Sequence, residues 1–200
     1  MSGSPSGKRV LDLAIATPLF LATLPLAPLV RLAMALTHDP GPLLFHAVRV
    51  GRNGRPIDVL KIRTMRTGAP GGSVTGHEDP RITRIGRLLR RTKLDELPQL
   101  WNVVRGDMSL VGPRPEDPRN VDWDHPLHRR VFTALPGITG LAQLAYVNEA
   151  ALLDGPDPDA QYRTEVLPRK LELDARYLDH QSLRLDVRII LATARRVLFR

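Results

Sequence analysis

The segment between Leu13 and Val30 constrains this 200-residue chain most, because it holds eighteen residues without a charged side chain. That length is close to the minimum of about 18–20 apolar residues that span a bilayer. Three prolines interrupt the segment (Pro18, Pro25 and Pro28), and each removes a backbone donor and bends or breaks a helix interior. The sequence therefore predicts a membrane-embedded helix that is kinked near Pro25.

Other interpretations of this segment stay open from the sequence. Lys8 and Arg9, the apolar run and the Ala-Met-Ala triplet at 33–35 resemble a cleaved signal peptide, although Arg31 lies before the triplet. A straight transmembrane helix conflicts with the prolines. Basic residues flank both ends of the segment, so the positive-inside rule does not orient a spanning helix. We expect a re-entrant helix over 8–37, which enters and leaves on one side, after a flexible stretch at 1–7.

The remainder, 38–200, is long enough for one compact domain with its own core. The formal net charge of +8 and the pI near 10.7 indicate an anionic partner: nucleic acid, anionic lipid or a phosphorylated substrate. Aromatic residues make up only 4% of the chain, which argues against stacking on single-stranded nucleic acid. The absence of cysteine excludes disulfides and thiolate metal sites and fits a cytosolic location.

The local patterns of this domain predict an α/β fold that is mainly helical with a small β element. Alternation over 56–65 predicts a strand with Lys61 and Arg63 on one face. A glycine-rich loop without a Walker pattern follows at 67–79, and Asp79-Pro80 is a typical helix start. Residues 182–200 form an amphipathic helix that either packs on the core or lies on anionic lipid.

The stretch "TKLDELPQL" places two adjacent carboxylates, Asp95 and Glu96, after a basic run. Between Arg81 and Lys93, six of thirteen residues are Lys or Arg and none is acidic. We expect a helix to begin at Asp95, where its dipole and the nearby arginines lower the pKa of the carboxyl group. An ionised aspartate among cations can attack phosphorus, but it can equally be a helix cap. The basic run itself is either a solvated face or part of such a site.

Two later stretches favour phosphate chemistry. In "GPRPE" two prolines restrict the backbone around Arg114, and a pre-organised guanidinium suits phosphate. "MSLV" before it predicts a short buried strand, and "PGITGLAQ" predicts a glycine-bearing turn beside Gln143. His125 and His128, near two aspartates, have spacing too loose to indicate a metal site, and we expect structural or surface roles for them.

These stretches together resemble the bacterial sugar transferase family, the small monotopic phosphoglycosyl transferases. The resemblance covers nearly the whole chain and is carried by "KRVLD", "RVGRNGRP", "LKIRTM", "PGITGLAQ" and "KLELDARYLDHQSLRLDVRIILAT". The most specific part is the central run "RITRIGRLLRRTKLDELPQLWNVVRGDMSLVGPRPE".

The resemblance implies a reaction at the cytosolic face of the bacterial inner membrane. A phospho-sugar passes from a nucleotide diphosphate sugar, usually UDP-linked, to polyprenyl phosphate, giving polyprenyl-diphosphate-sugar and UMP. It implies that Asp95 is the nucleophile and the nearest protein ligand of Mg²⁺, and that Glu96 activates polyprenyl phosphate or holds the metal. Five residues are assigned to substrate phosphates: Arg90, Arg114, Lys61, Arg63 and Gln143. It also implies a re-entrant membrane helix kinked at Pro25.

The chain departs from the family pattern at three places. Lys93 stands where serine is usual, Ala47 where glutamine is common, and Val147 where an arginine is expected to touch the nucleotide sugar. An acidic, proline-rich segment follows Val147. The sugar, the nucleotide base and the glycoconjugate pathway are therefore not specified.

Two other functions are compatible with the residues alone. The chain could be a non-catalytic, membrane-tethered basic module that binds nucleic acid or anionic lipid, with salt-sensitive affinity. It could also be an exported basic protein that begins near Thr37. We favour the enzyme, which needs no nucleic acid, contacts inner-membrane lipid, and is compatible with a monomer or a homodimer.

Overall fold

The computed structural model describes residues 6–37, 41–68, 79–147, 149–153 and 157–199. Its helices are α1 Ser6–Thr23, α2 Leu26–Leu36, α3 Arg84–Thr92, α4 Gln99–Arg105, α5 Pro126–Val131, α6 Leu141–Ala145, α7 Pro158–Gln161, α8 Leu167–Asp179 and α9 Leu183–Leu198. Its strands are β1 Leu44–Val50, β2 Pro56–Ile62, β3 Ser109–Val111 and β4 Gly137–Thr139. Short turns are η1 Arg52–Gly54, η2 Leu94–Glu96, η3 Pro118–Asn120, η4 Glu149–Leu152 and the π-helical η5 Tyr162–Val166.

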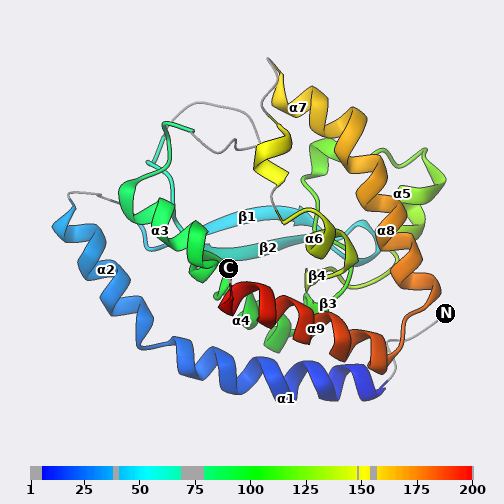
Figure 1. Ribbon diagram of the computed structural model, residues 1–200, viewed down its shortest axis with the longest axis horizontal. Helices are drawn as coiled ribbons and strands as arrows, with labels where there is room; N and C mark the ends of the chain where they lie inside the picture. The colour runs from blue at the N-terminus through cyan, green and yellow to red at the C-terminus, as the bar shows by residue number, and fades with distance from the viewer. Residues whose placement is uncertain (1–5, 38–40, 69–78, 148, 154–156, 200) are drawn as a thin grey trace.

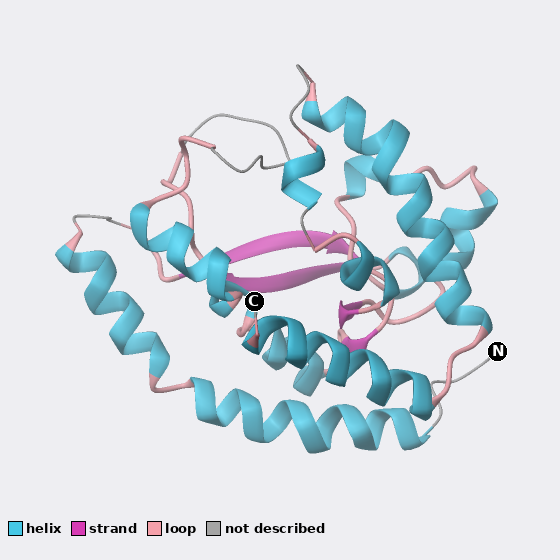
Figure 2. Ribbon diagram, in the orientation of Figure 1, coloured by secondary structure: helices cyan, strands magenta, loops and turns pink. Residues whose placement is uncertain are grey.

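Helices surround two small sheets (Figures 1 and 2). β1 and β2 form an antiparallel hairpin in which Ala47 is opposite Val59, and β3 and β4 form a parallel pair. The largest core cluster joins α1, the hairpin, α4, β3, α8 and α9. The described part of the chain is thus mainly helical with a small β content, as the sequence predicts.

The apolar N-terminal segment breaks where the prolines predict. α1 ends at Thr23, α2 begins at Leu26, and the two helices are bent by 43°. None of the described helices is by itself both long and apolar enough to cross a bilayer; the bent pair meets that measure only when the two helices are counted together. The outer side of the pair is apolar, because six leucines on it are exposed: Leu19, Leu21, Leu24, Leu29, Leu32 and Leu36. Residues 1–5 of the expected flexible N-terminus lie outside the described residues.

The first turns of α1 are hydrogen-bonded to the rest of the chain, which no sequence pattern predicts. The buried Lys8 Nζ donates to Asp186 Oδ2 of α9 at 2.8 Å, to the carbonyl of Val111 at 2.9 Å and to Tyr177 Oη at 3.2 Å. Arg9 donates to the carbonyls of Val103 and Val104 in α4. These bonds place α1 beneath α4 and α9 (Figure 1).

Several predicted element boundaries are wrong. β2 ends at Ile62 rather than at residue 65, because Met65 instead forms an isolated bridge with Ile82. Because of that extended stretch, α3 begins only at Arg84. Thr83 caps it, since the Thr83 hydroxyl accepts a hydrogen bond from Gly86 N at 2.9 Å. Asp79 is not its cap; its carboxylate binds Arg81.

The remaining element predictions have different outcomes. The glycine-bearing turn at 136–143 contains strand β4, and the predicted strand "MSLV" is confirmed as β3. The predicted C-terminal helix is confirmed as α9, which buries Asp186 and Ile189 against the core while Leu183, Val187 and Leu191 stay exposed. Most of the predicted loop 67–79 lies outside the described residues.

The Lys8–Asp186 contact generates a stability prediction. Lys8→Met leaves the Asp186 carboxylate buried without its ammonium, so we expect a loss of about 3–5 kcal/mol in the free energy of unfolding. Urea unfolding in detergent micelles, followed by circular dichroism, measures it. The double variant Lys8→Met/Asp186→Leu should lose clearly less than the single variant, since no charge is then stranded. Arg188→Met, at an exposed position of α9, is the control; an equal loss in all three variants would contradict the prediction.

Candidate active site

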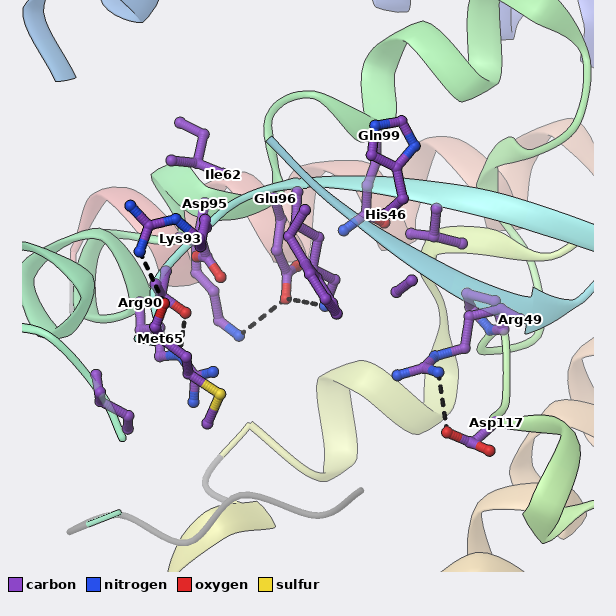
Figure 3. A pocket seen from close by; sticks show the side chains of 18 of the residues that line it. His46, Arg49, Ile62, Met65, Arg90, Lys93, Asp95, Glu96, Gln99 and Asp117 are labelled. Atoms are coloured by element: carbon purple, nitrogen blue, oxygen red, sulfur yellow. Dashed lines mark hydrogen bonds and ion pairs between the residues drawn. The ribbon is translucent and has the colours of Figure 1, made fainter. Parts of the chain in front are cut away.

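A cavity of about 1730 Å³ opens between the hairpin, α3, η2, the loop after β3 and η4. Small-molecule pockets usually measure about 300–1,000 Å³, so this cavity has room for a large ligand or for two. Figure 3 shows Arg90, Lys93, Asp95 and Glu96 next to one another on its wall, with Arg49 and Asp117 farther along.

A left-handed residue presents the acid pair to the cavity. Lys93 ends α3 with φ 59° and ψ 14°, and the chain turns there into η2. Asp95 is then only 7% exposed, and within the described residues its Oδ1 has no hydrogen-bond partner. α4 does not begin until Gln99, and no side chain caps it. Asp95 is therefore not a helix cap, which corrects the cap interpretation.

Glu96 is surrounded by cations. Its Oε1 lies 3.6 Å from Lys93 Nζ and 3.9 Å from Lys61 Nζ. Burial alone would raise the pKa of Glu96, but the charges of Lys61, Lys93 and Arg114 lower it to about 2. Glu96 is consequently ionised at neutral pH.

Asp95 behaves differently from its neighbour. Burial raises the pKa of its carboxyl group, and the negative charge of Glu96 raises it further, while Lys61, Lys93 and Arg90 oppose both effects. We expected a lowered pKa from a helix dipole. That expectation was wrong, because Asp95 precedes α4 by four residues and the field of a helix terminus falls off within its first turn.

Arg90 lies beside the acid pair because α3 packs closely on the chain after β2. A side chain at Gly86 would place its Cβ 2.0 Å from the carbonyl oxygen of Thr64, so only glycine permits this approach. Arg90 Nε then donates to Thr64 Oγ1 at 2.8 Å. The guanidinium lines the cavity with its orientation set by Thr64.

Arg114 occupies another part of the cavity wall. Its backbone N–H donates to Asp174 Oδ2 at 3.3 Å. Burial would lower the pKa of the guanidinium, but the carboxylates of Glu149 and Glu116 outweigh it and raise the pKa. The charge of Arg114 thus acts both on Glu96 and on a second pair of carboxylates, Glu116 and Glu149.

Some of the remaining predicted site residues line the cavity and others do not. Lys61 and Arg63 both line the cavity, although Arg63 donates to the carbonyls of Pro42 and Met65. Gln143 does not line it: its amide donates to the carbonyl of Gly137 at 3.4 Å. Pro25 is at the helix break, far along the chain from these groups.

Four cavity or supporting residues were not predicted as site residues: Lys93, Glu149, Tyr162 and Lys170. Lys93 stands out in the sequence as a departure from the family pattern, and Tyr162 lies in the acidic, proline-rich segment 152–165, which is another departure. Glu149 and Lys170 carry no such signal, because their pairing arises from the packing of η4 against α8.

The histidines have structural roles. His128 Nδ1 accepts from the backbone N–H of Asp122 at 3.0 Å, and His125 Nδ1 accepts from that of Leu127 at 3.2 Å. This agrees with the sequence interpretation. Within the described residues, no group of three or more His, Asp and Glu side chains is arranged to hold a metal ion by itself.

Asp174, which holds the backbone of Arg114, generates a pH prediction. Burial raises its pKa to about 7, against 3.8 in the unfolded chain. Between about pH 4 and 7 the folded state thus holds an extra proton, and this group makes stability fall as pH rises through that window. We expect Asp174→Asn to gain stability relative to the wild type as pH rises from 5 to 8 in urea unfolding. Asp124→Asn, at an exposed residue, is the control. If the stability difference between Asp174→Asn and the wild type did not change with pH, the raised pKa of Asp174 would be contradicted.

Comparison with known proteins identifies the family. A family model described as bacterial sugar transferase matches residues 4–200. The chain is 40% identical to a UDP-glucose:undecaprenyl-phosphate glucose-1-phosphate transferase of Caulobacter vibrioides, over 93% of this chain and 67% of the relative. It is 40% identical to an undecaprenyl-phosphate glucose phosphotransferase of Komagataeibacter xylinus, over 96% of this chain but 36% of the relative.

A third relative carries a different sugar in its name. The UDP-N-acetylgalactosamine-undecaprenyl-phosphate N-acetylgalactosaminephosphotransferase of Aeromonas hydrophila is 36% identical over 96% of this chain and 43% of its own length. The chain thus spans less than half the length of two of these three relatives. The family match extends over all of the described residues, including Asp95, Glu96, Arg90 and Arg114. This chain belongs to the bacterial sugar transferase family.

Proposed function

We propose that this protein transfers a phospho-sugar from a nucleotide diphosphate sugar, most simply a UDP-sugar, to polyprenyl phosphate such as undecaprenyl phosphate. The observation that carries the proposal is the pair of the buried Asp95 and the half-buried Glu96, beside Lys61, Lys93 and Arg90 on the wall of a large cavity. Its membership of the family, and relatives named for UDP-sugars and undecaprenyl phosphate, support the choice of substrates.

The proposed chemistry has two displacements at one phosphorus. A carboxylate oxygen of Asp95 attacks the β-phosphorus of the nucleotide sugar, the bond from that phosphorus to the bridging oxygen breaks, and UMP leaves. An oxygen of polyprenyl phosphate then attacks the same phosphorus. The acyl-phosphate bond breaks, the Asp95 carboxylate is restored, and polyprenyl-diphosphate-sugar is formed.

The surrounding cations suit this sequence. An anionic nucleophile must approach an anionic diphosphate, so the site needs positive charge to offset the repulsion. Lys61, Lys93 and Arg90 all act on the charge of Asp95. Arg114 adds a half-buried guanidinium, whose charge lowers the pKa of Glu96. We assign Arg90 and Arg114 to the substrate phosphates, followed by Lys61.

The carboxylates also fit a magnesium ion. Asp95 Oδ1 is buried without a partner among the described residues, and Glu96 is ionised next to it. Proteins commonly hold Mg²⁺ by one or two carboxylates and complete its coordination with substrate phosphate oxygens and water. We propose that Asp95, with Glu96 beside it, holds Mg²⁺, which when bound neutralises diphosphate charge.

The bent α1–α2 pair suits a substrate with a long apolar tail. Its exposed leucines form an apolar surface of the kind that soluble proteins seldom expose. We propose that the pair enters the inner membrane and returns to the same side, with the cavity on the cytosolic face. The tail of polyprenyl phosphate can then stay in the bilayer while its phosphate reaches Asp95.

Asp95→Asn tests the nucleophile. Since an amide cannot form the acyl phosphate, we expect turnover to fall by at least ~10³-fold. Intact-protein mass spectrometry should find a phospho-sugar adduct on the wild type incubated with nucleotide sugar alone, and none on the variant. Turnover is measured as UMP release with UDP-sugar, undecaprenyl phosphate and Mg²⁺.

Glu172→Gln, at an exposed residue of α8, is the matched control and should keep wild-type turnover. Near-normal turnover of Asp95→Asn would refute the nucleophile assignment. Absence of UMP release from every nucleotide sugar, together with salt-sensitive DNA binding indifferent to Asp95→Asn, would favour the non-catalytic basic module instead.

A further inference from the structure

One part of the cavity wall is acidic and aromatic rather than basic. Glu116, from the loop after β3, and Glu149, from η4, line it together with Tyr146, Tyr162 and Asn120. Carboxylates repel phosphate groups, so this part of the wall does not suit the diphosphate. An acidic cavity wall in a chain of net charge +8 therefore needs an explanation other than diphosphate binding.

A buried lysine holds this acidic group in place. Lys170 of α8, 1% exposed, lies with its Nζ 2.7 Å from Glu149 Oε2, 2.9 Å from Tyr162 Oη and 3.7 Å from Glu116 Oε1. Tyr162 in turn donates to Glu116 Oε1 at 2.6 Å. Since buried, mutually bonded side chains have little freedom, the Glu149 carboxylate has a fixed position.

Glu149 keeps hydrogen-bonding capacity toward the cavity. Its side chain is 24% exposed, and among the described residues Lys170 is the one hydrogen-bond partner recorded for it, through Oε2 alone. Burial would raise its pKa, but Arg114 and Lys170 outweigh this and lower it, so the group is a carboxylate that only accepts hydrogen bonds.

Asn120 provides a second, independent sign of a polar ligand. It lines the same cavity, is 8% exposed, and its Oδ1 has no hydrogen-bond partner within the described part of the chain. A buried acceptor without a partner is destabilising, and a hydroxyl donor from a ligand would satisfy it. The carboxylate of Glu149 and the Oδ1 atom of Asn120 thus both require hydrogen-bond donors, which the oxygens of an ionised phosphate do not supply.

The acidic group lines the same cavity as the reaction centre. Glu116 and Glu149 border one cavity of about 1730 Å³ together with Lys61, Arg90 and Lys93. A ligand whose phosphates lie among these three cations would therefore have the rest of its length in a cavity that Glu149 also lines.

We propose that Glu149 is a specificity-determining residue that accepts hydrogen bonds from hydroxyl groups of the transferred sugar, with Tyr146 and Asn120 beside it and Lys170 as its positioning residue. This inference rests on the proposed function and adds to it the position of the sugar. The cationic part of the cavity takes the diphosphate, and the acidic part takes the neutral, hydroxyl-rich ring. A sugar with its own carboxylate is rejected by like-charge repulsion.

The test compares Glu149→Gln with the wild type on UDP-glucose, UDP-galactose, UDP-N-acetylglucosamine and UDP-glucuronic acid, by UMP release. For the best neutral sugar we expect kcat/KM to fall about 10- to 100-fold, mostly through KM, because a hydrogen bond to a charged group is lost in ground and transition states alike. The discrimination against UDP-glucuronic acid should fall as well. The inhibition constant of UDP, which has no sugar, should change less than about 2-fold.

Glu165→Gln is the matched control, since it removes an exposed carboxylate from nearby η5 and should match the wild type in every measurement. Wild-type UMP release with an unchanged sugar ranking in Glu149→Gln would overturn the inference while leaving the proposed function intact. A rise in the UDP inhibition constant equal to the loss in kcat/KM would also overturn it, since it would show a structural effect on the whole cavity. If Glu149→Gln fails to fold, Glu149→Asp, which withdraws the carboxylate by one methylene, undergoes the same comparison.

Discussion

The buried ammonium of Lys8 is the contact on which the arrangement of this protein depends. It joins α1 to β3 through Val111, to α8 through Tyr177 and to α9 through Asp186. A buried charge is tolerated only when it is paired and hydrogen-bonded, so these four elements hold one another in a single geometry. α1 is therefore held against the domain that carries the cavity, and α2 packs on the same domain through Val30 and Met34, which cluster with Ile62 and Leu89. A membrane that receives the pair would have the cavity at a set height above it.

Within the cavity, charge is ordered rather than uniformly positive. The charges of Lys61, Lys93 and Arg90 act on Asp95, and the charge of Arg114 acts both on Glu96 and on the acidic group of Glu116 and Glu149. A diphosphate and a neutral sugar ring need opposite surroundings, and this order offers both. The left-handed turn at Lys93 supports it, because that turn directs the acid pair to the cavity and keeps a cation next to it.

Sequence patterns predicted what depends on local physics or on family resemblance. The helix break at Pro25 follows from the missing backbone donor, and the short strand at 109–111 follows from its apolar run. They failed where a tertiary contact outweighed a local preference. Asp79 and Asp95 both resemble helix caps, yet Asp79 binds Arg81 and Asp95 is buried facing the cavity, with its helix starting four residues later. Gln143 is polar and follows a glycine turn, but that turn contains β4, and the amide nitrogen of Gln143 donates to the carbonyl of Gly137 in that strand.

The amino-acid sequence by itself determined the class of the protein: a proline-broken apolar segment, an excess of cations and the "TKLDELPQL" motif that places the chain in the bacterial sugar transferase family. Only the tertiary structure decided the charge state and the neighbours of each group. Burial and contact between elements distant in the chain set pKa values, raising that of Asp95 and lowering that of Glu96 although the two are adjacent. The same long-range packing brings Lys170 of α8 to Glu149, a pairing that no local pattern encodes because it depends on how the helices pack.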